Sequence, residues 1–136
     1  MRSSIAVRTR GRGLHEVTSE VRAAVRDTGV EEGICVVFLR HTSASLVVAE
    51  NADPSARRDL ERFFDRIAPD GDPSYEHDAE GPDDMPAHIR AALTRTSESF
   101  VVAGADLVLG TWQGIFLFEH RHAPHRRTLD LMVVSA

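Results

Sequence analysis

The chain has 136 residues, 42% of them hydrophobic, and a formal net charge of −5 at pH 7. This length and composition suit one domain, residues 1–136, with its own core, and no apolar stretch is long enough to span a membrane. The acidic charge argues against nonspecific nucleic-acid binding, because the phosphate backbone attracts basic surfaces. The first residues lack the apolar segment of a secretory signal, so we expect a cytoplasmic protein.

The first third of the chain is predicted to contain three strands and one helix. Residues 4–10 alternate apolar and polar side chains, which predicts an edge strand that ends at a Gly-Arg-Gly segment. Apolar spacing over residues 18–28 predicts an amphipathic helix. Short β-branched runs at residues 34–39 and 46–49 predict two buried strands. Cys35 lies in the first of these runs, so we expect a buried thiol without a chemical role.

The clearest predicted helix follows Asp53 and Pro54, which suit the N-cap and the first helical position. Its large apolar residues fall at positions i, i+3, i+4 and i+7, namely Leu60, Phe63, Phe64 and Ile67. This spacing places them on one helical face. We therefore expect the helix to bury that face and to be central to the core.

The second half begins with a long loop, residues 68–84, rich in proline, glycine and acids. Loops of this length in a compact domain tend to be functional or disordered. Asp84-Met85-Pro86 predicts the start of the next helix. Four further strands are predicted at residues 99–103, 107–109, 115–119 and 128–134. Helices inserted among hairpins predict a single α+β domain with a largely antiparallel sheet.

For two further segments we predict no catalytic or binding role. Trp112 is expected to pack in the core. The basic residues 120–127 contain no interleaved aromatic side chains, so we expect a solvated loop rather than a nucleic-acid-binding patch.

The most polar segment, residues 75–88, holds five carboxylates and two imidazoles. Carboxylates crowded this closely face water, hold a cation, or set the pKa of an acid or base. His88 falls in the first turn of the predicted helix, where the helix dipole disfavours the imidazolium. A neutral ring at this position can bind a metal or take up a proton.

A third histidine, His41, lies with Thr42 and Ser43 between two predicted buried strands. Together with His77 and His88 it could hold one divalent ion, because three imidazoles and an open water position make a catalytic zinc site. No tight histidine spacing accompanies these residues. A metal site and ordinary polar loop residues therefore both remain open.

Further polar residues lie where a predicted strand ends and a predicted helix begins. Glu50 and Asp53 are candidate general bases, although Asp53 also suits the helix N-cap. The free N–H groups of a helix N-terminus bind anions, and Asn51 could add a donor to a phosphate. Gln113 lies near two glycines and could reach a ligand.

Five segments taken together resemble the YjbQ-like family: residues 41–45, 50–54, 75–78, 80–89 and 110–115. The resemblance covers nearly the whole chain. It implies an α+β domain that assembles as a homotrimer with sites near the subunit contacts. It also implies activity as a secondary thiamine-phosphate synthase.

The resemblance also implies the site residues. The polar positions of the family fall here on His41, Thr42, Asn51, Asp53, His77, His88 and Gln113. We expect a divalent metal, Zn²⁺ or Mg²⁺, at His41, His77 and His88. We expect a small phosphorylated substrate to contact Thr42, Ser43, Asn51, Asp84 and Gln113, with Glu50 and Asp53 as catalytic groups.

The implied reaction joins a pyrimidine methyl diphosphate to a thiazole phosphate and releases pyrophosphate. Such a reaction needs donors that hold the diphosphate, and the motifs contain no lysine or arginine, so we expect weak synthase activity. One alternative is a metal-dependent hydrolase with Glu50 or Asp53 as general base. Another is a trimeric protein that binds a small phosphorylated ligand without any chemistry.

Overall fold

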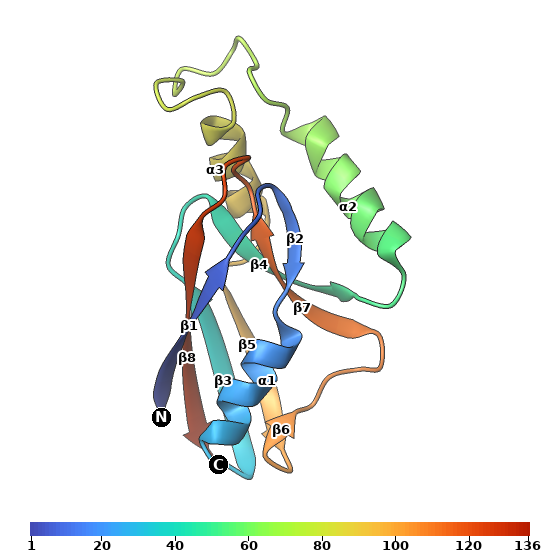
Figure 1. Cartoon of the computed structure of the whole chain (residues 1–136), viewed down its shortest axis with the longest axis vertical. Coiled ribbons are helices and arrows are strands. Elements are labelled where there is room, and N and C mark those ends of the chain that lie inside the picture. Colours follow the sequence, from blue (N-terminus) through green and yellow to red (C-terminus); the bar gives the residue numbers. More distant parts are fainter.

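Eight strands form two antiparallel sheets in the computed structural model, which describes residues 1–136, and three helices pack around them (Figure 1). The strands are β1 (Arg2–Arg8), β2 (Gly13–Glu16), β3 (Glu32–Leu39), β4 (Ala44–Glu50), β5 (Ser97–Ala103), β6 (Asp106–Leu107), β7 (Gln113–Glu119) and β8 (Arg126–Ser135). The helices are α1 (Thr18–Asp27), α2 (Pro54–Ile67) and α3 (Asp84–Leu93). The predicted α+β class is confirmed.

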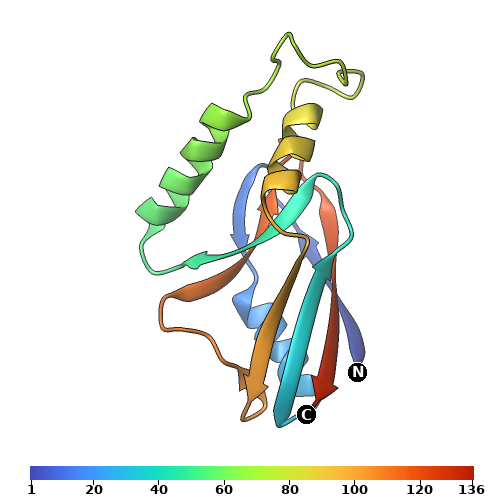
Figure 2. The ribbon, with the colours of Figure 1, turned by 180° about the vertical axis from the view of Figure 1, so that it is seen from behind.

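The larger sheet has the strand order β1-β8-β3-β5-β6 and the smaller sheet has the order β2-β7-β4. The main core lies between the inner face of the larger sheet, the smaller sheet and α1, which contributes Val21 and Val25. Cys35 is fully buried in this core, as predicted. The outer face of the larger sheet carries no helix (Figure 2). None of the three helices has the length and apolar content that crossing a bilayer requires.

Strand β2 was not predicted, because the glycines before it were interpreted as the end of a strand. Gly11 and Gly13 have φ angles of 125° and 143°, a region that favours glycine, and they turn the chain from β1 into β2. A Cβ atom on Gly11 would lie 2.6 Å from the carbonyl oxygen of His122. The glycines therefore allow the chain to bend and then to pair with β7.

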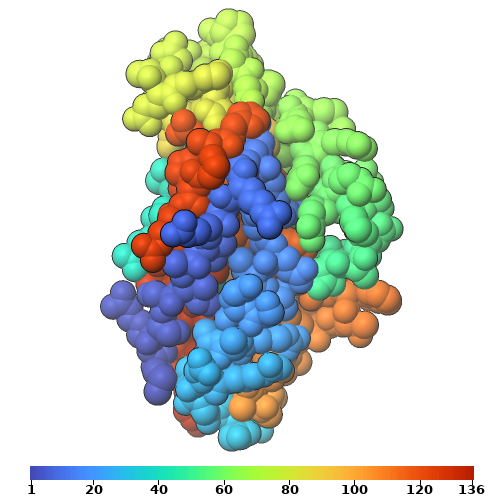
Figure 3. Space-filling view, viewed as in Figure 1, coloured from blue at the N-terminus to red at the C-terminus, as the bar shows by residue number.

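The prediction that α2 is central to the core is wrong. No residue of α2 is buried, and Leu60, Phe63 and Ile67 are between 36% and 47% exposed. Only Phe64 packs inward, with its ring centroid 5.2 Å from that of Phe118. The helix lies along one side of the molecule (Figure 3). The periodicity identified the helix correctly, but the rest of the chain covers its apolar face only at Phe64.

Two further expectations are corrected. Trp112 is 63% exposed rather than in the core, because it lies in the turn before β7. The basic segment 120–127 is not a solvated loop throughout, since His120 and Arg127 are buried. Burial strongly favours the neutral imidazole and lowers the pKa of His120 to about 3.

Arg127 is buried because it pairs with a fully buried carboxylate, that of Glu119 at the end of β7. The Nε atom of Arg127 donates to Oε1 of Glu119 at 2.8 Å, and the Thr9 hydroxyl donates to the same oxygen at 2.7 Å. Burial alone would raise the pKa of Glu119, but the hydrogen bonds from Arg127 and Thr9 lower it below its ordinary value. This ion pair joins β7 to β8, and the hydrogen bond from Thr9 connects it to the end of β1.

Replacing Glu119 with glutamine should destabilise the protein by about 3–5 kcal/mol, because it leaves the buried charge of Arg127 without a counter-ion. Unfolding in denaturant at a fixed protein concentration measures this loss, with the exposed Glu76→Gln as control. In the wild type, the ionised Glu119 stabilises the folded protein above the ordinary carboxyl pKa of 4.5. This stabilisation is lost as the pH falls through the lowered pKa of Glu119 in the folded state. Equal stability of the two variants would contradict this account.

Candidate functional site

Two imidazoles and one carboxylate meet at the N-terminus of α3. Asp84 is the first residue of the helix and His88 follows one turn later, so both side chains lie on the same helical face. The preceding loop brings His77 to them. One donor atom from each residue lies within 4.8 Å of the other two, with Oδ2 of Asp84 at 2.8 Å from Nε2 of His77 and 3.2 Å from Nε2 of His88.

The loop between α2 and α3 is ordered by its own hydrogen bonds. The Tyr75 hydroxyl donates to the carbonyl oxygen of Pro69, and the backbone N–H of Gly71 donates to the carbonyl oxygen of Pro82. A carboxylate oxygen of Asp72 accepts from the backbone N–H of Ser74. These contacts hold the loop in the position that presents His77.

The ring of His88 is oriented by the backbone of the segment before β4. Its Nδ1 atom lies 3.2 Å from the carbonyl oxygen of Thr42, which can only accept a hydrogen bond. Nδ1 therefore carries the hydrogen, and a neutral ring then presents the lone pair of Nε2 to Oδ2 of Asp84. Two acceptors face each other at this point, so the arrangement needs a proton or a metal ion between them.

The donor set fits a zinc ion. Zinc bonds of about 2.0–2.2 Å and tetrahedral angles place neighbouring ligand atoms about 3.4 Å apart. The separations of 2.8 and 3.2 Å from Oδ2 of Asp84 are shorter than this, so small side-chain rotations would open the group around an ion. Mg²⁺ prefers oxygen ligands, whereas imidazoles suit zinc and neighbouring transition metals. Three protein ligands would leave at least one coordination position open, as in catalytic zinc sites. The donors therefore favour Zn²⁺ over Mg²⁺.

A cavity of 330 Å³ opens beside this cluster, and His77 is part of its wall. Tyr75, Asp78 and Met85 also line it, together with glycine and proline residues of the loop. The side chain of His77 is 53% exposed and that of His88 is 33% exposed, whereas that of Asp84 is 3% exposed. The imidazoles are therefore accessible to a ligand, while the carboxylate is held within the protein.

Sequence reasoning missed Arg121, whose Nη1 atom donates to Oδ1 of Asp84 at 2.7 Å. This arginine was assigned to a solvated loop because nothing in the local pattern separated it from Arg126, which is exposed. The sequence feature that could have identified Arg121 is its position directly after the apolar run of β7.

The structure brings His77 and His88 together but leaves His41 out of the group, and Asp84 supplies the third donor instead. The Nε2 atom of His41 accepts a hydrogen bond from the backbone N–H of Thr128 at 3.0 Å. Burial, followed by the charge of Arg127, lowers the pKa of His41.

The other two residues of this segment also have structural partners. Thr42 contacts the cluster only through its carbonyl oxygen. The hydroxyl of Ser43 accepts from Arg127 at 2.9 Å.

The remaining predicted site residues lie at the opposite end of β4: Glu50, Asn51, Asp53 and Gln113. Ala44 pairs with Glu119 near the histidine cluster, whereas Glu50 pairs with Gln113 at the far end. A strand of this length spans about 20 Å. We expected Asn51, Asp53 and Gln113 to line the same cleft as the histidines, and within one chain they do not.

Each of these four residues has a structural partner. Asp53 caps α2 by accepting from the backbone N–H of Ser55 at 2.9 Å, and this hydrogen bond lowers the pKa of Asp53. Glu50 accepts from the backbone N–H of Asp53. Asn51 donates to Glu16, and Gln113 accepts from the backbone N–H of Gly110.

Comparison with known proteins identifies one family. The model of the family described as "UPF0047 protein YjbQ-like" matches residues 3–136. A UPF0047 protein of Synechocystis is 51% identical over 129 residues, which cover 95% of this chain and 88% of that protein. The UPF0047 protein YjbQ of Escherichia coli O157:H7 is 44% identical over 128 residues, covering 93% of this chain and 92% of that one.

Solved structures have the same fold. A hypothetical protein from Aeropyrum pernix K1 superposes with a TM-score of 0.90 at 29% identity, covering 100% of this chain and 99% of that one. A YjbQ/UPF0047 family protein from Clostridium acetobutylicum superposes with a TM-score of 0.84 at 34% identity, covering 98% and 99%.

The geometry predicts which histidines bind metal. His77→Ala and His88→Ala should each lose stoichiometric Zn²⁺, because each removes one of three ligands, whereas His41→Ala should keep it. Metal content after dialysis against low Zn²⁺, measured by atomic emission, tests this, with circular dichroism as the check of folding. Loss of zinc from His41→Ala alone would contradict the assignment.

Proposed function

The chain belongs to the UPF0047 protein YjbQ-like family, and we propose that it is a zinc-dependent enzyme that acts on a small phosphorylated substrate. One observation carries this proposal: the Nε2 lone pair of His88 faces Oδ2 of Asp84 at 3.2 Å, and Nε2 of His77 lies 2.8 Å from the same oxygen. A divalent cation between them satisfies all three donors.

Hydrolysis is the reaction that this geometry supports best. A bound zinc ion supplies an activated water and a Lewis acid for a phosphoryl oxygen. His77, which lines the cavity, and His88 would hold the ion beside it, and Asp84 would neutralise part of its charge. Asp78 lines the same cavity and can move a proton between water and the leaving group. Glu50 and Asp53 lie too far along β4 to serve as this base within one chain.

Thiamine-phosphate synthesis is the second candidate, and one feature favours it. The cavity beside His77 has an aromatic wall in Tyr75, which suits a planar heterocycle better than an aliphatic phosphate. A diphosphate leaving group needs donors as well as a metal. Arg121 already gives its donors to protein acceptors, so the metal would supply most of the stabilisation.

Product analysis separates these reactions. The zinc-loaded protein should release inorganic phosphate from small phosphate esters, and Asp78→Asn should keep its zinc and lower kcat by about 10²–10⁴-fold. The matched control is the exposed Asp59→Asn, which lies on α2 away from the cavity. Release of pyrophosphate from the pyrimidine and thiazole substrates, without ester hydrolysis, would favour the synthase. Ligand binding with neither product would contradict both reactions.

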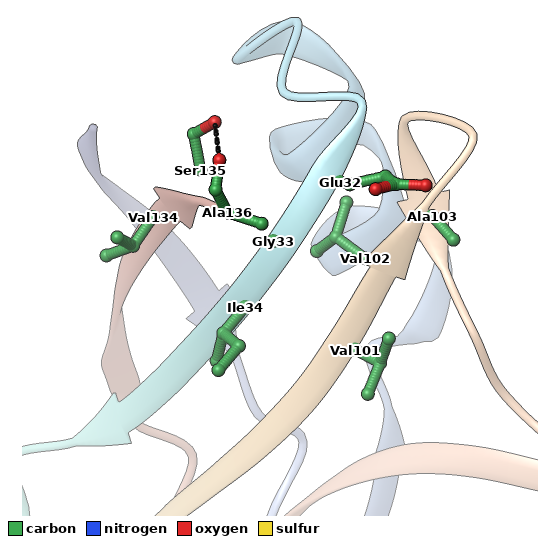
Figure 4. A pocket seen from close by; sticks show the side chains of 9 residues that line it. All are labelled: Glu32, Gly33, Ile34, Val101, Val102, Ala103, Val134, Ser135 and Ala136. Atoms are coloured by element: carbon green, nitrogen blue, oxygen red, sulfur yellow. Dashed lines mark hydrogen bonds between the residues drawn. The ribbon is translucent and has the colours of Figure 1, made fainter.

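We also propose that the protein assembles as a homotrimer through the outer face of its larger sheet. Ile34, Phe38, Val101, Met132 and Val134 are each between 44% and 59% exposed. Their neighbours along each strand are buried in the core, so these five side chains lie on the opposite face of the sheet. No helix covers that face (Figure 2). Three of them, Ile34, Val101 and Val134, line an open depression of 380 Å³ at one end of this face (Figure 4). A large exposed apolar patch on a soluble domain favours an interface.

A charge on this face should break the assembly. Ile34→Glu should convert a trimer into a monomer, because burying an unpaired carboxylate at the interface is costly. Light scattering at micromolar concentration measures the mass, and Leu93→Glu, also at an exposed apolar position but on α3, is the control. A monomeric wild type, or a trimer unchanged by Ile34→Glu, would contradict the proposal.

A further inference from the structure

Arg121 joins three parts of the molecule around the candidate metal centre. It follows β7, and its side chain is 21% exposed. Its Nη1 atom donates to Oδ1 of Asp84 at 2.7 Å, and its Nη2 atom donates to the carbonyl oxygen of Glu80 at 2.9 Å. Its Nε atom lies 3.2 Å from Oδ2 of Asp83. All three guanidinium nitrogens therefore face the segment that precedes and begins α3.

These contacts distinguish two roles for Arg121, binding a substrate phosphate and positioning a metal ligand. A phosphate-binding arginine needs free N–H groups that point into the cavity. The two Nη atoms of Arg121 donate hydrogen bonds to a carboxylate and to a carbonyl group. Arg121 is also not among the residues that line the cavity beside His77. Substrate recognition is therefore not its function in this arrangement.

We infer that Arg121 is a positioning residue for the metal centre, an inference that rests on the proposed function. By holding Oδ1 of Asp84, it fixes the rotation of the carboxylate so that Oδ2 faces Nε2 of His77 and Nε2 of His88. Asp84 then binds the ion through one oxygen. The contact with Glu80 ties the loop that carries His77 to the same guanidinium.

Arg121 also has an opposing effect, since its positive charge repels a nearby cation. Asp83 lies against the guanidinium with its side chain 12% exposed and offsets that charge. Outer-shell partners of metal ligands typically change metal affinity by about 10- to 100-fold when they are removed. The orienting effect therefore outweighs the repulsion, and removing the arginine should weaken metal binding.

Zinc affinity, measured by competition with a chromophoric chelator, tests this inference. Arg121→Met should bind Zn²⁺ about 10- to 100-fold more weakly than the wild type. Arg121→Lys should share the loss, because an ammonium group keeps the charge but cannot span Asp84 and Glu80. The control is Arg126→Met, which removes an equal charge from an exposed side chain at the start of β8.

The visible spectrum of the Co²⁺-substituted protein gives a second readout, which reports the coordination geometry. We expect the spectrum to change in Arg121→Met and to stay the same in Arg126→Met. Arg121→Gln keeps one donor for the Glu80 carbonyl group and covers the case in which the methionine variant fails to fold. It should show the same loss of affinity.

The outcomes distinguish this inference from the proposed function. A wild-type protein that binds no zinc overturns both. A zinc-binding wild type with equal or tighter binding in Arg121→Met and Arg121→Gln overturns only the role of Arg121. Full affinity in Arg121→Lys also overturns it, because a side chain that cannot span Asp84 and Glu80 would then serve equally well.

Discussion

A carboxylate that is almost fully withdrawn from water organises the candidate site. The side chain of Asp84 is 3% exposed, and a buried charge is tolerated only when its oxygens are paired. Oδ1 faces Arg121, and Oδ2 faces His77 and His88. The connection after β7, the loop before α3 and the first turn of α3 meet at this one group. The requirement to satisfy Asp84 therefore fixes how these three segments are placed relative to one another.

The sequence was most informative where the structure depends on local signals. The start of α3 could be predicted because Asp84-Met85-Pro86 is a helix-start pattern, and the i, i+4 spacing then set Asp84 and His88 on one face. Of the three histidines that we expected to converge, His77 and His88 meet at Asp84, whereas His41 does not. The burial of Cys35 followed from an apolar run in β3.

The rest depends on contacts between residues far apart in the chain. Asp53 was grouped with the histidines because composition does not reveal that β4 separates its two ends by about 20 Å. His41 was grouped with them because composition does not reveal that its ring accepts a hydrogen bond from the backbone of Thr128. Arg121 was missed because its partner, Asp84, lies 37 positions away. The apolar spacing predicted α2 correctly, but Phe63 remains exposed, because spacing along a helix does not reveal whether another segment of the chain packs on that face.

The most direct test of the account is a crystal structure of the wild-type protein grown with Zn²⁺, with diffraction data on both sides of the zinc absorption edge. The account predicts an anomalous peak between Nε2 of His77, Oδ2 of Asp84 and Nε2 of His88, with Arg121 still bound to Oδ1. A peak at His41, or no peak within bonding distance of Asp84 in zinc-saturated crystals, would contradict it.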